Sequence, residues 1–295
     1  ANTGASNNPA WAQINLANGV TGNLPVANLN SVRRERAVRD ITGGRASSKR
    51  DQACGRQDGT LDPAHLRSLL PGCSRLTLDA PAADVEASRR QVLPLVELRA
   101  YFELSREELD AVERGAEDPE LQPLIDAATR IALAEDTAIF HGYAAGGIKG
   151  IDQASSHPIL PIPDAYQEYP HRIAEATRLL RLAGVDGPYA IAMGPRYYTG
   201  LTQAVGDGGY PVLNVVRKLV DGPLVWAPAV KGAVVLSLRG GDFELTIGRD
   251  LSIAYQSHTD RAVRLYLVET MAFRVLAAEA AVALVHKDGK GSRKG

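Results

Sequence analysis

The chain has 295 residues, of which 45% are apolar and 23% charged, and its formal net charge at pH 7 is −1. This balance is typical of a globular protein with one large domain or two ordinary ones. It predicts no general attraction to nucleic acid or to an anionic membrane. Only 5% of the residues are aromatic, which also argues against a surface that stacks on bases.

Charge is distributed unevenly along the chain. Residues 33–56 contain eight basic and three acidic side chains, whereas residues 103–136 contain eleven acidic and three basic ones. Two interpretations stay open: these are solvated faces, or they are complementary patches that meet between copies of the chain.

The cysteines and apolar runs favour a cytosolic protein. Cys54 and Cys73 are too few for a disulfide framework, and the sequence leaves open whether they are bonded. The first residues lack the basic and apolar regions of a signal peptide. The longest apolar run, 275–285, is interrupted by Glu279 and is too short to span a bilayer. We therefore expect no membrane partner.

Residues 1–74 sustain neither a helical nor a strand period. A short amphipathic helix at residues 7–16 is compatible with Asn8 as cap and with Trp11 and Ile14 on one face. Residues 43–60 read as a loop, and Asp62 with Pro63 favours a helix start.

From residue 75 the signals are stronger. Residues 75–80 predict a strand and residues 92–104 a long extended segment. Ser105 and Glu108 predict a capping box for a helix that ends near Arg114, with Gly115 as its stop. A longer helix is predicted from residue 119 or 123 to His141, whose position at the C-terminus favours a cation.

The remaining chain favours helices in the middle and strands at the end. Helices are predicted at 171–183, 195–204 and 210–219, around a short buried strand at 187–193. Strands are predicted at 223–226, 233–238, 262–273 and 280–286. Residues 240–255 alternate apolar and polar side chains and predict two short strands joined at Gly248, Arg249 and Asp250. Without a βαβ rhythm, the fold class is α+β.

No catalytic, metal or cofactor site is predicted. The sequence lacks a nucleophile elbow, a zinc-protease helix and a phosphate-binding loop. The six histidines are scattered, so they form no local metal signature. The adjacent pairs Glu107/Glu108 and Glu135/Asp136 are interpreted as surface charge, since neighbours on a helix point in different directions.

Five blocks of sequence resemble the encapsulin shell proteins, also called the linocin-type bacteriocin family. They are LPLVELRAYFELSREELDAVERG at 93–115, EDTAIFHGY at 135–143, GVDGPYAI at 184–191, RGGDFELTIGRDLSIAY at 239–255 and AVRLYLVETMAF at 262–273. They occur in family order and with family spacing.

The resemblance implies an HK97-like capsid fold with an axial domain, a peripheral domain with a long spine helix, and an extended loop that reaches a neighbouring subunit. The implied ranges are 1–57 for an N-terminal arm that is atypical of the family, 58–92 for the extended loop, 93–149 and 225–286 for the peripheral domain, 150–224 for the axial domain, and 287–295 for a basic, disordered tail.

The resemblance also implies a function without catalysis. The chain would assemble with copies of itself, about 60 as the default for a compact chain, into an icosahedral nanocompartment in the bacterial cytoplasm. The family's cargo includes dye-decolourising peroxidases and ferritin-like iron proteins, which link the compartment to oxidative stress and iron storage. A virus or prophage capsid protein of the same fold, or less credibly a hydrolase or bacteriocin, is the alternative, and no nucleic acid is expected inside.

Two sites follow from the resemblance. The C-terminal targeting peptide of the cargo would dock in a groove formed by Trp11, Ile14, Arg36, Asp40 and Ile253, although Ile253 is equally interpretable as core. The loop at residues 204–211 would line the five-fold pore.

The pore residues would be Asp207, Gly208, Gly209 and Tyr210, with Asp207 repeated as a ring of carboxylates that favours cations; a plain flexible turn is the alternative. Some family members stack a flavin on a tryptophan before the LPL block. The corresponding residue here is Ala87, so no flavin is expected.

Overall fold

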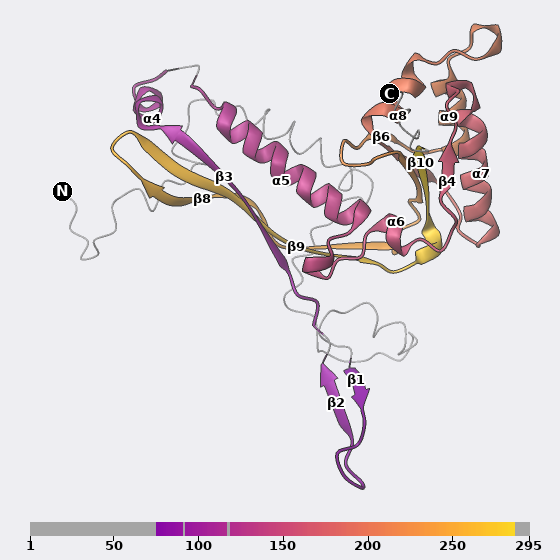
Figure 1. The fold of residues 1–295 in the computed structure, drawn as a ribbon, viewed down its shortest axis with the longest axis horizontal. Helices are drawn as coiled ribbons and strands as arrows, with labels where there is room; N and C mark the ends of the chain where they lie inside the picture. Colours follow the sequence, from indigo (N-terminus) through magenta and orange to yellow (C-terminus); the bar gives the residue numbers. More distant parts are fainter. Residues whose placement is uncertain (1–74, 91, 117–118, 287–295) are drawn as a thin grey trace, which may run out of the picture.

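The computed structural model describes residues 75–90, 92–116 and 119–286. They form three parts (Figure 1): a projecting two-stranded hairpin, a three-stranded sheet crossed by a long helix, and a five-stranded sheet flanked by shorter helices. The hairpin consists of β1 (Arg75–Leu78) and β2 (Ala87–Arg90), paired antiparallel. The strand at 75–80 was predicted; β2 was not.

The three-stranded sheet has the order β3-β9-β8 and is antiparallel throughout. Its strands are β3 (Val96–Ser105), β8 (Phe243–His258) and β9 (Ala262–Val275). Along β3 the side chains of Ala100, Phe102 and Leu104 are buried, whereas the residues between them are exposed. Because strand side chains alternate between faces, only one face of β3 packs against the core.

The long helix α5 (Gln122–His141) covers that face, as Figure 1 shows. It begins with a proline in its first turn and ends at Gly142, which has φ 85°. The preceding α4 (Arg106–Glu113) is capped by Ser105, whose hydroxyl accepts a hydrogen bond from the backbone N–H of Glu107 at 3.2 Å. The predicted capping box is only half formed, because the Glu108 carboxylate accepts from the N–H of Glu120.

The five-stranded sheet has the order β4-β10-β7-β5-β6. Its strands are β4 (Leu160–Ile162), β5 (Tyr189–Met193), β6 (Leu224–Trp226), β7 (Ala233–Ser237) and β10 (Ala281–His286). The helices of this part are α6 (Ile151–Ala154), α7 (Tyr169–Leu182), α8 (Pro195–Gln203) and α9 (Val212–Val220). Short 3-10 turns occupy Ala144–Gly146, Tyr166–Glu168, Asp207–Gly209 and Ala278–Ala280.

The two sheets share a continuous apolar interior. Met271 and Phe273, at the end of β9, pack in one cluster with Ala190, Val234 and Leu236 of the five-stranded sheet. A second cluster lies under α7, α8 and α9, and a third lies between α5 and the three-stranded sheet. β7 and β10 come from the range 225–286 but pair with β5 and β4 from the range 150–224. The five-stranded sheet therefore joins both ranges, and the domain boundaries stay a prediction.

Three expectations from the sequence were wrong. Residues 243–258 form one strand, not two, because the chain continues through a bulge at Gly248. An added Cβ at Gly248 would be 2.3 Å from the Leu95 side chain, so this glycine provides space for a close approach. No βαβ unit was expected, but β5 and β6 are parallel neighbours joined through α8 and α9, and β4 and β10 also pair parallel, so the described part of this α+β fold contains two parallel strand pairs. Glu135 and Asp136 are each 1% exposed, so this pair is not surface charge.

Candidate assembly surfaces and pore loop

The β1–β2 hairpin presents apolar side chains to solvent. Leu76 and Leu78 are 41% and 43% exposed and lie two residues apart, so they share one face of the ribbon. Their cross-strand partners are Arg89 and Ala87. An isolated two-stranded ribbon is marginally stable in water, and Figure 1 shows this one projecting away from both sheets. Its geometry suits a contact with another molecule.

The outer face of the three-stranded sheet carries alternating rings and cations. The Tyr101 and Tyr266 rings lie opposite each other with centroids 5.5 Å apart. The Arg99 guanidinium lies 5.0 Å from the centroid of Tyr266, and that of Arg264 lies 5.8 Å from Tyr101. Hydrogen bonding to Tyr101 and then to Glu97 raises the pKa of Arg99. Glu97 pairs with Arg99 at 2.6 Å and Glu103 lies opposite Arg264, so this face combines tyrosine rings with charges of both signs.

The predicted pore loop joins α8 to α9 and is closed at its base. The N–H of Gly206 donates to the carbonyl of Tyr210 at 2.9 Å, and Val205 and Pro211 form an isolated bridge. Gly208 and Gly209 have φ values of 79° and 81°, in the left-handed region that favours glycine. An added Cβ at either position would meet nothing within 4 Å. Conformation, and not packing, therefore requires these glycines.

The loop is also accessible. Tyr210 is 46% exposed, and the Lys218 ammonium lies 5.7 Å from its ring centroid. Asp207 begins the 3-10 turn that carries both glycines. Asp207, Gly208 and Gly209 thus form one 3-10 turn that leads into the exposed Tyr210, while the place of these four residues at a five-fold axis stays a prediction.

Of the residues predicted for the cargo groove, Ile253 alone lies within the described ranges; Trp11, Ile14, Arg36 and Asp40 lie outside them. Ile253 is opposite Leu267 on β9 and is half-buried in the cluster beneath α5. Ile253 therefore contributes to the core, and part of its side chain is accessible to solvent. Ala87, the residue at the flavin position, lies at the start of β2, and the absence of flavin stays a prediction.

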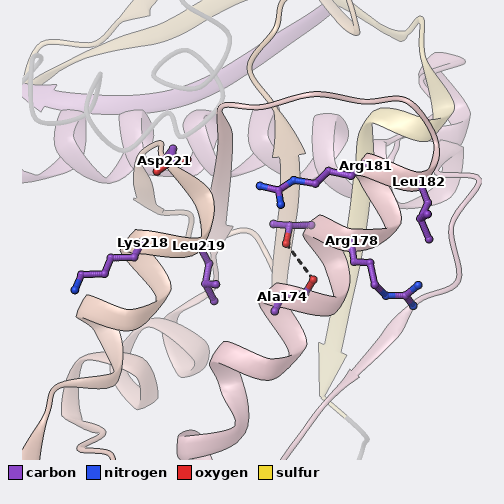
Figure 2. Close-up of a pocket in the computed structure, with 8 residues that line it drawn as sticks. Ala174, Arg178, Arg181, Leu182, Lys218, Leu219 and Asp221 are labelled. Atoms are coloured by element: carbon purple, nitrogen blue, oxygen red, sulfur yellow. Dashed lines mark hydrogen bonds between the residues drawn. The ribbon is translucent and has the colours of Figure 1, made fainter.

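A surface hollow of about 430 Å³ lies between α7 and α9 (Figure 2). Arg178, Arg181 and Lys218 surround it, together with Asp221 at the end of α9. Figure 2 shows the two arginines projecting from α7 and no side chains converging on one point. A single dashed hydrogen bond there joins the Thr177 hydroxyl to the carbonyl of Ala174 and belongs to α7 itself. The hollow is basic but has no catalytic arrangement.

The groups with a perturbed pKa in the five-stranded part are two buried tyrosines and a half-buried histidine. Tyr169 and Tyr197 stack with centroids 4.3 Å apart, and burial raises the pKa of both, that of Tyr169 to about 12. Burial and then Arg196 lower the pKa of His286, whose ring lies 6.4 Å from that of Tyr197. Within residues 75–90, 92–116 and 119–286 no three potential metal ligands cluster, and no described helix has the length and apolarity needed to cross a membrane.

These features define a capsid-like subunit. A projecting hairpin, a long helix on an antiparallel sheet and a compact mixed sheet with an exposed tip make up the HK97-like capsid fold. A solved structure from Mycobacterium phage Bobi shares this fold, with a TM-score of 0.51, 14% identity and coverage of 75% of this chain and 83% of that one.

The chain belongs to the encapsulin family. The family model described as "Encapsulating protein for peroxidase" matches residues 72–272. A type 1 encapsulin shell protein of Rhodospirillum rubrum is 52% identical over 203 residues, 69% of this chain and 72% of the relative. The protein is therefore a structural shell subunit that assembles with copies of itself, and not an enzyme.

Two further relatives extend the comparison. The type 1 encapsulin shell protein of Mycobacterium tuberculosis is 47% identical over 72% of this chain and 79% of its own length. That of Brevibacterium linens is 37% identical over 94% of both chains. Because the latter match covers 94% of this chain, it includes part of residues 1–74.

Sequence reasoning missed the hairpin's apolar face and the ion pair in which Nη2 of Arg239 lies 2.8 Å from Oδ1 of Asp242. The signal for the first was present, because Leu76 and Leu78 alternate with polar residues. For the second, the two glycines between the arginine and the aspartate indicated a tight turn.

Proposed function

We propose that the shell built from this chain encloses a cargo enzyme in the bacterial cytoplasm, with a peroxidase as the first candidate. The match of residues 72–272 to a family described as encapsulating a peroxidase carries the proposal. The relatives from Rhodospirillum rubrum, Mycobacterium tuberculosis and Brevibacterium linens are bacterial proteins. A ferritin-like iron protein is the second candidate cargo, through the resemblance to the family.

The cargo would be tethered by its C-terminal targeting peptide. The sheet side of the docking groove would include Ile253, which is half-buried beside Leu251 and Leu265. Burying an apolar peptide side chain there would gain roughly 25 cal/mol per Å² removed from water. Trp11, Ile14, Arg36 and Asp40 would complete the groove.

The shell would contain about 60 subunits in icosahedral symmetry, whose interfaces repeat identically around each axis. The β1–β2 hairpin projects from the rest of the subunit, which supports a contact between this hairpin and a neighbouring subunit. The loop of Asp207 to Tyr210 supports a pore for small substrates, because its tip is exposed and its base is closed. No nucleic acid is expected inside.

The experiment is expression of the full chain with and without a candidate cargo. The chain alone should form uniform hollow particles in negative-stain electron microscopy. A fluorescent protein that carries the C-terminal segment of a dye-decolourising peroxidase should co-purify inside them, and the same protein without that segment should not. Particles filled with genome-length nucleic acid, or particles that exclude the tagged protein, would contradict the proposal.

The groove is tested by Ile253→Ala with Ala254→Ser as the matched control. Ala254 is the next residue on β8 and pairs with Tyr266, on the other face of the sheet. We expect Ile253→Ala to reduce cargo loading at least about tenfold, the equilibrium effect of 1.4 kcal/mol of lost contact. Equal loading in both variants, in particles of normal size, would remove Ile253 from the groove.

A further inference from the structure

His141, the last residue of α5, has both ring nitrogens engaged. Nδ1 lies 2.6 Å from Oδ2 of Asp152, at the start of α6, and Nε2 lies 3.1 Å from the carbonyl oxygen of Ala229. Asp152 and Ala229 are far apart in the sequence. The imidazole therefore joins three separate segments of the chain.

Both partners of the imidazole are hydrogen-bond acceptors. A carboxylate and a backbone carbonyl donate nothing, so each ring nitrogen must supply the proton of its own bond. Imidazolium alone has two N–H groups. Either neutral tautomer leaves one ring lone pair facing an oxygen lone pair, at Asp152 or at Ala229. The end of a helix adds a further preference for a cation at this position.

The charged surroundings agree with this assignment. Asp152 is the charged group in contact with the imidazole within the described part of the chain. Its other oxygen, Oδ1, is buried and has no hydrogen-bond partner there, so the imidazolium is the main compensation for a half-buried carboxylate. Lys149 and Lys231 are exposed on the adjoining segments. Asp136 lies on α5 five residues before His141, and its side chain is buried.

The three joined segments connect the two sheets. α5 packs on the three-stranded sheet. α6 contacts β10 of the five-stranded sheet, and Ala229 lies between β6 and β7 of the same sheet.

The backbone around His141 is tightly packed. An added Cβ on Gly150 would lie 2.2 Å from the N of Gly142, and the Gln153 amide donates to the carbonyl of His141. Loss of one hydrogen bond at His141 should therefore affect the whole segment 142–153.

We propose that His141 is a proton-dependent latch between the two sheets of the subunit. When protonated, it holds the end of α5 to both α6 and the β6–β7 segment. Deprotonation breaks one of these two bonds and loosens the relative position of the sheets. The latch is an intrasubunit device and does not depend on which cargo the shell encloses.

The test compares amide hydrogen exchange of assembled full-chain particles at pH 5.5 and pH 8.5. After correction for intrinsic exchange, protection in 142–153 and 227–232 should fall about tenfold in the wild type, the effect of one charge-assisted bond. In His141→Arg, a permanent cation, protection should stay high at both pH values. In His141→Gln it should be low at both.

Two outcomes overturn the latch. One is equal protection of the wild-type segments at both pH values. The other is the same pH dependence in His141→Arg as in the wild type, which would assign the change to another group. If a variant fails to assemble, the protonation of His141 is measured directly on wild-type particles. Magic-angle-spinning NMR of ¹⁵N-histidine should show at pH 5.5 an imidazolium with both N–H groups hydrogen-bonded, and its absence also overturns the proposal.

Discussion

Arg239 holds Asp242 with one edge of its guanidinium, the edge formed by Nε and Nη2. Nε lies 3.1 Å from each carboxylate oxygen, and Nη2 lies 2.8 Å from Oδ1. The two residues between them, Gly240 and Gly241, have φ values of 85° and 82°, which fold the arginine back over the aspartate. The backbone carbonyl of Asp242 accepts from Leu276 and Ala277, so this turn also fixes the end of β9.

Asp242→Asn should destabilise the subunit. Asp242 is buried, and its replacement leaves the guanidinium without its counter-charge at the entrance to β8. We expect the free energy of unfolding to fall by about 2 kcal/mol, measured by urea denaturation. Asp260→Asn, in the exposed turn between β8 and β9, is the control and should change it by less than about 0.5 kcal/mol. Equal effects of the two changes would show that the Arg239 contact contributes nothing specific.

Charge on the hairpin should block assembly without unfolding the subunit. In the double variant Leu76→Asp and Leu78→Asp, two exposed apolar side chains become acidic, so the subunit's own core is untouched while any apolar contact made by this face is lost. Size-exclusion chromatography should show small species in place of particles, with an unchanged circular dichroism spectrum. Thr77→Asp lies on the other face of the same strand and should still assemble. Particle formation by the double variant would exclude this face as a contact.

The sequence allowed prediction of the elements with strong periodicity or clear ends. The helix from Gln122 to His141 has regular apolar spacing and a terminal glycine, and the structure confirms it. The buried strand Tyr189–Met193 was also predicted. Local rules suffice for such elements, because their boundaries are encoded in neighbouring residues.

Features that depend on distant residues escaped prediction. Gly248 reads as a turn, yet it is a point of contact with Leu95, more than a hundred residues away. The pair Glu135 and Asp136 reads as surface charge, yet tertiary packing buries it. His141 was assigned a structural role at a helix end, but neither Asp152 nor Ala229 can be inferred from that position. The pore tip was placed through family resemblance, since its own residues specify only a turn.

Reversal of charge at the loop tip should slow cationic substrates. If Asp207 repeats around a five-fold opening, Asp207→Lys replaces a ring of carboxylates by a ring of ammonium groups. At low salt we expect entry of a cationic substrate to the enclosed enzyme to slow about tenfold, and the difference should shrink at high salt. A neutral substrate is the internal control. An unchanged rate for the cationic substrate at low salt would place the entry route elsewhere.

Two buried tyrosines should respond in opposite ways to loss of their hydroxyls. Tyr189 donates to the carbonyl of Val185 at 2.7 Å, so Tyr189→Phe should reduce the free energy of unfolding by about 1 kcal/mol. The hydroxyl of Tyr197 is buried without a hydrogen-bond partner in the described ranges. Tyr197→Phe should therefore cost nothing or stabilise the subunit by up to about 1 kcal/mol. Urea denaturation of both variants measures the contrast, and a larger loss in Tyr197→Phe would reverse it.

Acid should destabilise the subunit through His286. Burial, reinforced by Arg196, lowers the pKa of this histidine, so the folded state binds fewer protons than the unfolded state below the ordinary value of about 6.5. The free energy of unfolding consequently rises with pH in that window, and the stability is lost as the pH falls through about 6.5.

The midpoint of urea denaturation, followed from pH 7.5 to pH 5, tests the contribution of His286. His286→Phe removes the titration, and it also removes a buried Nε2 that has no hydrogen-bond partner in the described part of the chain. Its midpoint should fall less between pH 7.5 and pH 5 than that of the wild type. His171→Phe, at an exposed position on α7, should keep the wild-type pH dependence. If both variants follow the wild-type curve, the protonation of His286 does not contribute to the pH dependence of the urea midpoint, and the acid sensitivity arises at another group.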